Sequence, residues 1–156
     1  MKIRLIAVGQ RPPQWVTTGF TEYAKRMPRE MPLQLVEVPA ASRRNVPAAK
    51  VRELEADRLL GQLGAGDRVV VLDERGKSWS TLVLAENLDD WRMQGRNVAV
   101  LVGGADGLHA RCLDRADDIL SLSAMTLPHA LVRVLLAEQI YRAWTVRSGH
   151  PYHRGG

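Results

Sequence analysis

Residues 97–108 read NVAVLVGGADGL, a continuous apolar run that ends in a pair of glycines. Such a run suits the buried centre of a parallel sheet, because helices cover the strands of that sheet on both faces. Residues 68–72 form a second run of this type, and residues 2–8, 33–38 and 118–122 are rich in β-branched or aliphatic side chains. The pattern predicts five strands, and the fourth passes directly into the glycines.

Helical stretches separate the predicted strands. Apolar residues recur at helical spacing over residues 15–26, in a stretch that starts near Pro47, and in another that starts at the capping residue Ser80. A further helix can open at Asp106 or Gly107. Strands that alternate with helices predict an α/β fold, with a mostly parallel sheet of five or six strands and helices on both faces.

The last predicted helix, which starts near Pro128, is apolar on nearly all sides. Such a helix must be covered on two sides, and one of them faces its own sheet. We expect the other side to face a second copy of the chain in an isologous dimer; the alternative is burial within one chain. Its apolar residues are Leu131, Val132, Val134, Leu135, Leu136, Ala137, Ile140, Tyr141, Ala143, Trp144 and Val146.

The chain has 156 residues, a formal net charge of +5 and one cysteine. This length suits a single domain, residues 1–156, that needs neither disulfides nor a structural metal. Unpaired Cys112 fits a reducing cytoplasmic compartment. The N-terminus lacks the apolar core of a signal peptide and Arg133 interrupts the most apolar segment, so we expect a soluble protein without a membrane span. The positive charge favours a polyanionic partner.

Two segments with small residues follow predicted strands. Gly103 and Gly104 end the fourth strand, where the lack of a Cβ lets a ligand approach the backbone. Residues 122–129, LSAMTLPH, join the fifth strand to the last helix, and their free backbone groups could clasp a nucleoside. Taken singly, the two segments are equally well explained as a tight turn and a capped helix entry. Together they predict one ligand pocket.

Other polar candidates lie near the C-terminus. Tyr152, His153 and Arg154 could stack on a base, handle a proton and contact a phosphate; the alternative is a frayed terminus. Arg142 lies four residues after Glu138 on the apolar helix, where the two can form an ion pair or meet a substrate. We expect no metal site, because the tail histidines lack a third ligand nearby.

Five motifs follow one another along the chain. They are Ile6-Ala7-Val8-Gly9, Gly103-Gly104-x-x-Gly107-Leu108, Leu122-Ser123-x-Met125-Thr126-Leu127-Pro128-His129, Arg133-Val134-Leu135-x-x-Glu138-Gln139-x-Tyr141-Arg142-Ala143 and Tyr152-His153-Arg154. Together they closely resemble the RlmH family, small SPOUT-class methyltransferases that act on large-subunit ribosomal RNA. The resemblance covers essentially the whole chain.

The resemblance implies a cytoplasmic homodimer that uses S-adenosylmethionine to methylate N3 of a pseudouridine in large-subunit (23S) ribosomal RNA. It also implies a C-terminal trefoil knot, an exception to the usual absence of threaded chains. The family pattern assigns the methyl donor to three strand-end segments. In this sequence the matching residues are Leu72, Gly103, Gly104, Leu122, Ser123, Ala124, Met125, Thr126 and Leu127.

A sulfonium methyl group is already activated, so the enzyme chiefly has to hold the donor carbon and the attacking nitrogen in line. The N3 proton of pseudouridine must leave, and His129, His153 or water could accept it. We assign to Arg142 and Arg154 the stabilisation of the developing anion or of flanking phosphates.

Other functions stay open. A related knotted methyltransferase could act on another RNA such as transfer RNA, and a non-catalytic ribosome-binding protein would bind RNA without binding the donor. A Rossmann-type methyltransferase is disfavoured, because the first strand ends in a single Gly9 without a glycine-rich loop.

Overall fold

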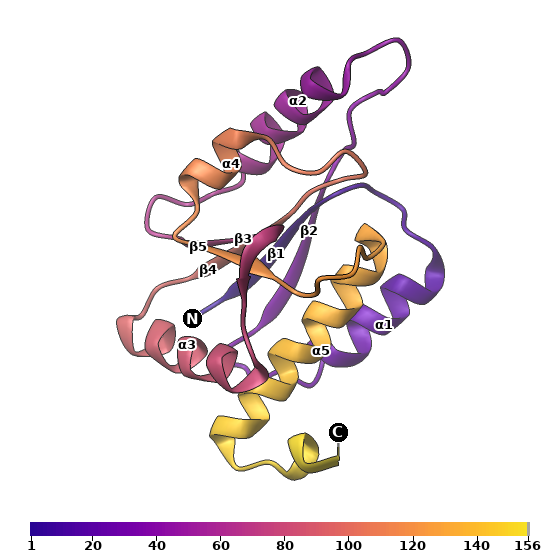
Figure 1. Cartoon of the computed structure of the whole chain (residues 1–156). Coiled ribbons are helices and arrows are strands. Elements are labelled where there is room, and N and C mark those ends of the chain that lie inside the picture. Colours follow the sequence, from indigo (N-terminus) through magenta and orange to yellow (C-terminus); the bar gives the residue numbers. More distant parts are fainter. Residues whose placement is uncertain (156) are drawn as a thin grey trace.

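The computed structural model describes residues 1–155 and places five strands side by side in one sheet (Figure 1). Gly156, the last residue of the expected domain, lies outside the described residues. The strands are β1 (Ile3–Val8), β2 (Leu33–Val38), β3 (Arg68–Ser78), β4 (Val98–Val102) and β5 (Asp118–Ser121). Their order is β2-β1-β4-β3-β5 and every pairing is parallel. The predicted fold class is confirmed, and the sheet has five strands.

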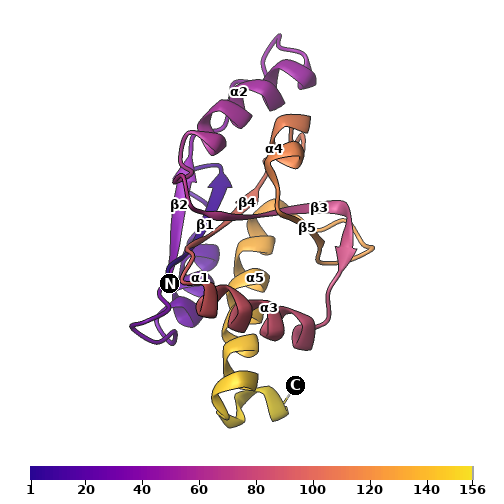
Figure 2. The same cartoon turned by 90° about the vertical axis from the view of Figure 1, so that its left-hand side faces the viewer.

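Helices cover both faces of the sheet, with α1, α3 and α5 on one face and α2 and α4 on the other (Figures 1 and 2). The connections β1 to β2 and β3 to β4 run in one direction across the sheet, and the other two run in the opposite direction. Because crossovers are right-handed, this reversal puts the two sets of helices on opposite faces. The helices are α1 (Gln14–Ala24), α2 (Ala48–Leu60), α3 (Thr81–Gln94), α4 (Ala110–Arg115), α5 (His129–Ser148) and the 3-10 helix η1 (Pro151–Gly155).

The core consists of two apolar layers, one on each face of the sheet. Successive side chains of a strand point to opposite faces. Leu5 of β1 therefore joins the layer under α1, α3 and α5, whereas Ile6 joins the layer under α2 and α4. Cys112 is fully buried in the second layer, and burial raises the pKa of its thiol to about 11, which suits a packing role.

Local signals in the sequence explain most helix ends. The hydroxyl of Ser80 accepts a hydrogen bond from the Val83 N–H at 3.1 Å, as expected of an N-cap. The fourth helix differs from the prediction: it begins at Ala110, not at Asp106 or Gly107. Gly104 and Gly107 instead pair in an isolated bridge, and Gly107 adopts a left-handed φ of +80° that cannot continue into a helix.

The third strand is longer than the predicted 68–72. It continues to Ser78 after an irregularity between Leu72 and Lys77, and its second half pairs with β5 again. Gly76 makes this return possible, since a Cβ there would lie 2.6 Å from the backbone carbon and oxygen of Ile119. The trefoil knot that the family resemblance implies stays a prediction. Among residues 1–155, no helix is long and apolar enough to cross a membrane.

Candidate active site

The carboxyl ends of β4, β3 and β5 enclose a cleft of about 390 Å³. These strands are neighbours in the sheet, so the segments that follow them meet at one edge. The lining residues come from the ends of β3, β4 and β5, from the segments after them and from the first turns of α5. They are Leu72, Asp73, Glu74, Val102, Gly103, Gly104, Ala105, Asp106, Gly107, Leu108, Leu120, Ser121, Leu122, Ser123, Met125, Thr126, Leu127, His129 and Val132.

The structure brings together eight of the nine residues that the sequence assigned to the methyl donor. Ala124 does not line the cleft. The two segments that were expected to form one pocket do converge there, whereas a contact of each residue with the donor stays a prediction. The eight are Leu72, Gly103, Gly104, Leu122, Ser123, Met125, Thr126 and Leu127.

Residues 103–108, which we call the glycine loop, fold back tightly on themselves. The N–H of Gly107 donates to the Gly104 carbonyl at 3.1 Å. A Cβ on Gly103 would lie 2.9 Å from the carbonyl carbon and oxygen of Gly107 and from Cγ of Leu108. Only glycine therefore fits at position 103, because the backbone of Gly107 and the side chain of Leu108 occupy the space beside it.

Residues 122–128, the segment between β5 and α5, are held by local hydrogen bonds. The Ser121 hydroxyl donates to the Ser123 carbonyl at 3.1 Å, and the Ser123 hydroxyl accepts from the Met125 N–H at 2.9 Å. Met125 is 78% exposed, so its thioether chain lies over the mouth of the cleft rather than in a core. The last helix starts near Pro128, as the sequence indicated, and Pro128 occupies its N-cap position.

Carboxylates give the cleft a negative wall. Asp73, Glu74 and Asp106 all line it. Hydrogen bonds from the Arg75 guanidinium to Asp73, at 2.8 and 3.0 Å, lower the pKa of that carboxyl below its usual value. Within residues 1–155 no group of three or more His, Cys, Asp or Glu side chains is placed to hold a metal ion. Because Asp73 pairs with Arg75 and Asp106 with Arg43, Glu74 is the lining carboxylate that has no ion pair among residues 1–155.

The four residues that the sequence assigned to catalysis do not lie together in one chain. His129 lines the cleft, at the first residue of α5. Arg142 lies thirteen residues further along α5, which at 1.5 Å per residue is about 20 Å from His129. His153 and Arg154 lie in η1, which packs against α5 beyond the opposite edge of the sheet (Figures 1 and 2).

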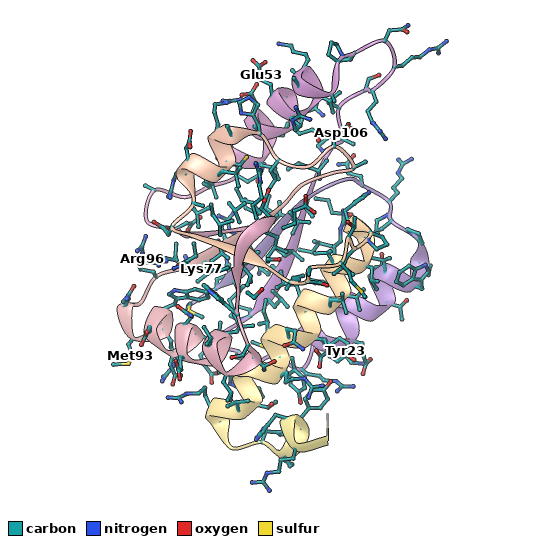
Figure 3. All side chains as sticks on the ribbon, viewed as in Figure 1. Tyr23, Glu53, Lys77, Met93, Arg96 and Asp106 are labelled. Atoms are coloured by element: carbon teal, nitrogen blue, oxygen red, sulfur yellow. The ribbon has the colours of Figure 1, made fainter. Side chains whose placement is uncertain are left out.

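The tail is ordered around Tyr152. Its hydroxyl lies 3.2 Å from Oε1 of Glu138, its ring is 5.0 Å from the Arg142 guanidinium, and its centroid is 4.7 Å from that of Tyr141. Burial, together with Tyr23 and Glu138, raises the pKa of Tyr152 to about 12, so the phenol stays neutral and donates a hydrogen bond to Glu138. Figure 3 shows Tyr23 close to this part of α5.

Arg142 forms the ion pair with Glu138 that its spacing allowed. Two guanidinium nitrogens, Nε and Nη2, lie 2.7 and 2.6 Å from Oε1 of Glu138. This pairing raises the pKa of Arg142. His153 is different: its Nδ1 is buried and has no hydrogen-bond partner in the described part of the chain. The end of α5 therefore holds one ion-paired arginine, and the tail beside it holds one buried imidazole nitrogen without a partner in the described chain.

Arg133 is a key residue whose role the sequence did not reveal. Its guanidinium donates to Oε2 of Glu37 at 2.6 Å and to the carbonyls of Val8 and Gly9 at 3.2 and 2.7 Å. Only 2% of Arg133 is exposed. It therefore fixes the first turns of α5, and with them His129, to the carboxyl ends of β1 and β2. An arginine inside an otherwise apolar stretch was the available signal.

Comparisons with known proteins show which family the chain belongs to. A family model described as "Predicted SPOUT methyltransferase" matches residues 1–153. Two relatives named "Ribosomal RNA large subunit methyltransferase H", from Hahella chejuensis and Marinomonas sp., are 56% and 53% identical over 155 residues. Each match covers 99% of this chain and 99% and 100% of the relative, respectively.

One solved structure is described as "Structural insights into the 2-OH methylation of C/U34 on tRNA". It is 20% identical to this chain, with a TM-score of 0.52, and the match covers 92% of this chain and 97% of that one. At this identity the similarity supports the fold alone.

Proposed function

Because this chain belongs to the SPOUT methyltransferase family, we propose that it transfers a methyl group from S-adenosylmethionine to N3 of a pseudouridine in large-subunit ribosomal RNA. The observation that supports this most is the joint cleft of the glycine loop and residues 122–128. The names of the two relatives, which match this chain over nearly its whole length, favour ribosomal RNA as the substrate.

The residues of the cleft fit S-adenosylmethionine. The absence of a Cβ at Gly103 lets the glycine loop fold back on itself, so that the loop lines the cleft in one defined shape. Leu72, Leu122 and Leu127 supply apolar surface for a planar base. The carboxylate of Glu74, which has no ion pair among residues 1–155, attracts a positive charge. When bound, the donor supplies an electrophilic methyl group on a sulfonium.

The side chains of the site then orient the RNA and manage one proton. N3 of the target base loses its proton to a base and forms a bond to the methyl carbon, while the bond from that carbon to sulfur breaks and leaves a neutral thioether. His129 at the cleft, the unsatisfied Nδ1 of His153, and water are the candidates. Arg142 and Arg154 stabilise the negative charge that develops on the base, or hold the phosphates beside it.

This division of labour requires two copies of the chain. The cleft and the tail lie at opposite ends of α5, so one copy cannot place both on the same base. Trp15, Met125 and Leu135 expose apolar surface near the cleft end of α1 and α5. A two-fold axis beside this patch would bring the tail of one copy to the cleft of the other.

Methyl transfer from labelled S-adenosylmethionine tests the function. Large ribosomal subunits, whole ribosomes and transfer RNA are incubated separately, and the labelled nucleoside is identified after digestion. We expect N3-methylated pseudouridine in large-subunit RNA. Label in transfer RNA alone would support a different RNA target. RNA binding without label, and without heat on titration with the donor, would support a non-catalytic ribosome-binding protein.

Replacing Arg142 with alanine should lower the single-turnover methylation rate about 100-fold, because a preorganised cation near the reacting base is lost. Arg147→Ala is the matched control. Arg147 also lies on α5, but its side chain is 49% exposed and pairs with Asp89. Donor binding should stay unchanged in both variants. A single-turnover rate equal to that of the control would exclude Arg142 from the reaction.

A further inference from the structure

Two loops lie beside the cleft at the same edge of the sheet. β1 and β4 are neighbours, and the loops that follow β1 and β2 leave the sheet together, because Val8 pairs with Val38 and the Gly9 N–H donates to the Val38 carbonyl at 2.8 Å. The cleft therefore occupies the β4, β3 and β5 side of this edge, and the two loops occupy the β1 and β2 side.

Both loops carry arginines that face solvent. Arg11 follows β1, and Arg43 and Arg44 lie in residues 39–47 between β2 and α2, which we call the basic loop. All three are exposed; Arg11 and Arg44 form no ion pair with any other described residue. Lys50 and Arg52 add positive charge at the start of α2. The surface formed by these two loops and the start of α2 carries more basic than acidic groups. None of these basic side chains lines the cleft.

The basic loop is attached to the glycine loop by polar contacts. Asp106 accepts two contacts from Arg43, from Nε to Oδ2 at 3.1 Å and from Nη2 to Oδ1 at 3.5 Å. Figure 3 shows Asp106 beside the chain that leads into α2. Nη1 of Arg43 has no hydrogen-bond partner among residues 1–155, and the side chain is 63% exposed. The guanidinium thus holds Asp106 with one edge and presents the other to solvent.

A buried carboxylate fixes the root of the same loop. Oε2 of Glu55 accepts a hydrogen bond from the Ala41 N–H at 3.0 Å. Its Oε1 has no partner in the described chain and lies 3.2 Å from where a Cβ of Gly104 would be. Glu55 is 4% exposed. The basic loop is therefore held in a defined position next to the cleft rather than extended freely into solvent.

We propose that Arg11, Arg43 and Arg44 bind phosphodiester groups of the RNA strand next to the target base, with Asp106 as the positioning residue for Arg43. The inference rests on the proposed function, since it assigns the flanking part of the same substrate. A base that reaches the cleft carries its strand across the sheet edge, where these guanidiniums are exposed. Arginine pairs with phosphate through two parallel hydrogen bonds, which favours RNA over an acidic protein surface.

The test compares RNA affinity at several salt concentrations for wild type, Arg44→Ser and the double variant Arg43→Ser/Arg44→Ser. Deproteinised large-subunit RNA and intact large subunits serve as probes. We expect the double variant to bind RNA about 10-fold more weakly and to lose about one to two units of the slope of log affinity against log salt. KM for the RNA should rise while kcat changes little.

The matched control is Lys2→Ser/Arg92→Ser, which removes the same charge at the amino end of β1 and in α3. The single variant Arg44→Ser should fold as wild type does, because Arg44 is exposed and has no ion pair among residues 1–155. It therefore keeps the test valid if the double variant misfolds. Affinity and salt slope equal to the control would overturn the proposal. A loss seen only with intact subunits would also overturn it, in favour of a ribosomal protein as partner. Absence of methylation by wild type would instead remove the proposed function.

Discussion

Replacing Gly103 with alanine should weaken binding of S-adenosylmethionine about 100-fold, because each backbone group that loses its hydrogen bond to the donor costs about 1–3 kcal/mol. The new Cβ would lie 2.9 Å from the carbonyl group of Gly107 and from Cγ of Leu108. The backbone of Gly107 cannot rotate away as a flexible side chain would, so the glycine loop has to open. An opened loop moves the backbone groups that approach the donor.

Isothermal titration with the donor measures this effect, and denaturant unfolding shows whether the variant stays folded. Gly66→Ala is the matched control, because a Cβ at Gly66 would meet no atom within 4 Å. We expect the control to bind the donor as wild type does. Wild-type donor affinity in a folded Gly103→Ala variant would mean that the glycine loop does not hold the donor.

Replacing Arg133 with methionine should lower the free energy of unfolding by about 3 kcal/mol. Methionine keeps the apolar stem, but the ion pair with Glu37 and the hydrogen bonds to the Val8 and Gly9 carbonyls are lost. Glu37 is 29% exposed and can regain water, which holds the loss near the lower end for a buried pair.

Urea unfolding at one fixed protein concentration measures this loss, since the stability of a dimer depends on concentration. Arg147→Met is the control, because Arg147 lies on the same helix with a side chain 49% exposed. We expect it to cost less than about 1 kcal/mol. Equal losses for the two variants would show that the Arg133 contacts do not fix α5 to the sheet.

The sequence predicted the sheet well because its strands are short and apolar. The first, second, fourth and fifth strands begin and end within one residue of the predicted ranges. The third strand extends six residues further, to Ser78. Its second half, residues 73–78, is polar and contains Gly76, so only its close approach to Ile119 across the sheet makes it a strand. Such a long-range contact leaves no local signal.

The cleft was predictable because parallel strands end at one edge, which brings Gly103 and residues 122–128 together. The positions of Arg142, His153 and Arg154 relative to the cleft were not predictable, because helical spacing does not show which end of a helix faces a ligand. Residues 39–47 were recognisable as a loop rich in proline and arginine, but a role for them in binding RNA was not. Their charges are few along the chain and gather with Arg11 only through the pairing of β1 with β2.

Methylation by a purified hybrid dimer tests most directly whether one active site needs two chains. One subunit carries Gly103→Ala, the other carries Arg154→Ala, and two different tags select the mixed dimer. Both parent dimers should be inactive. If the tail acts on the partner's cleft, the hybrid keeps one intact site of two and has about half the wild-type rate. A hybrid as inactive as its parents would show that the cleft and the tail of one chain must work together.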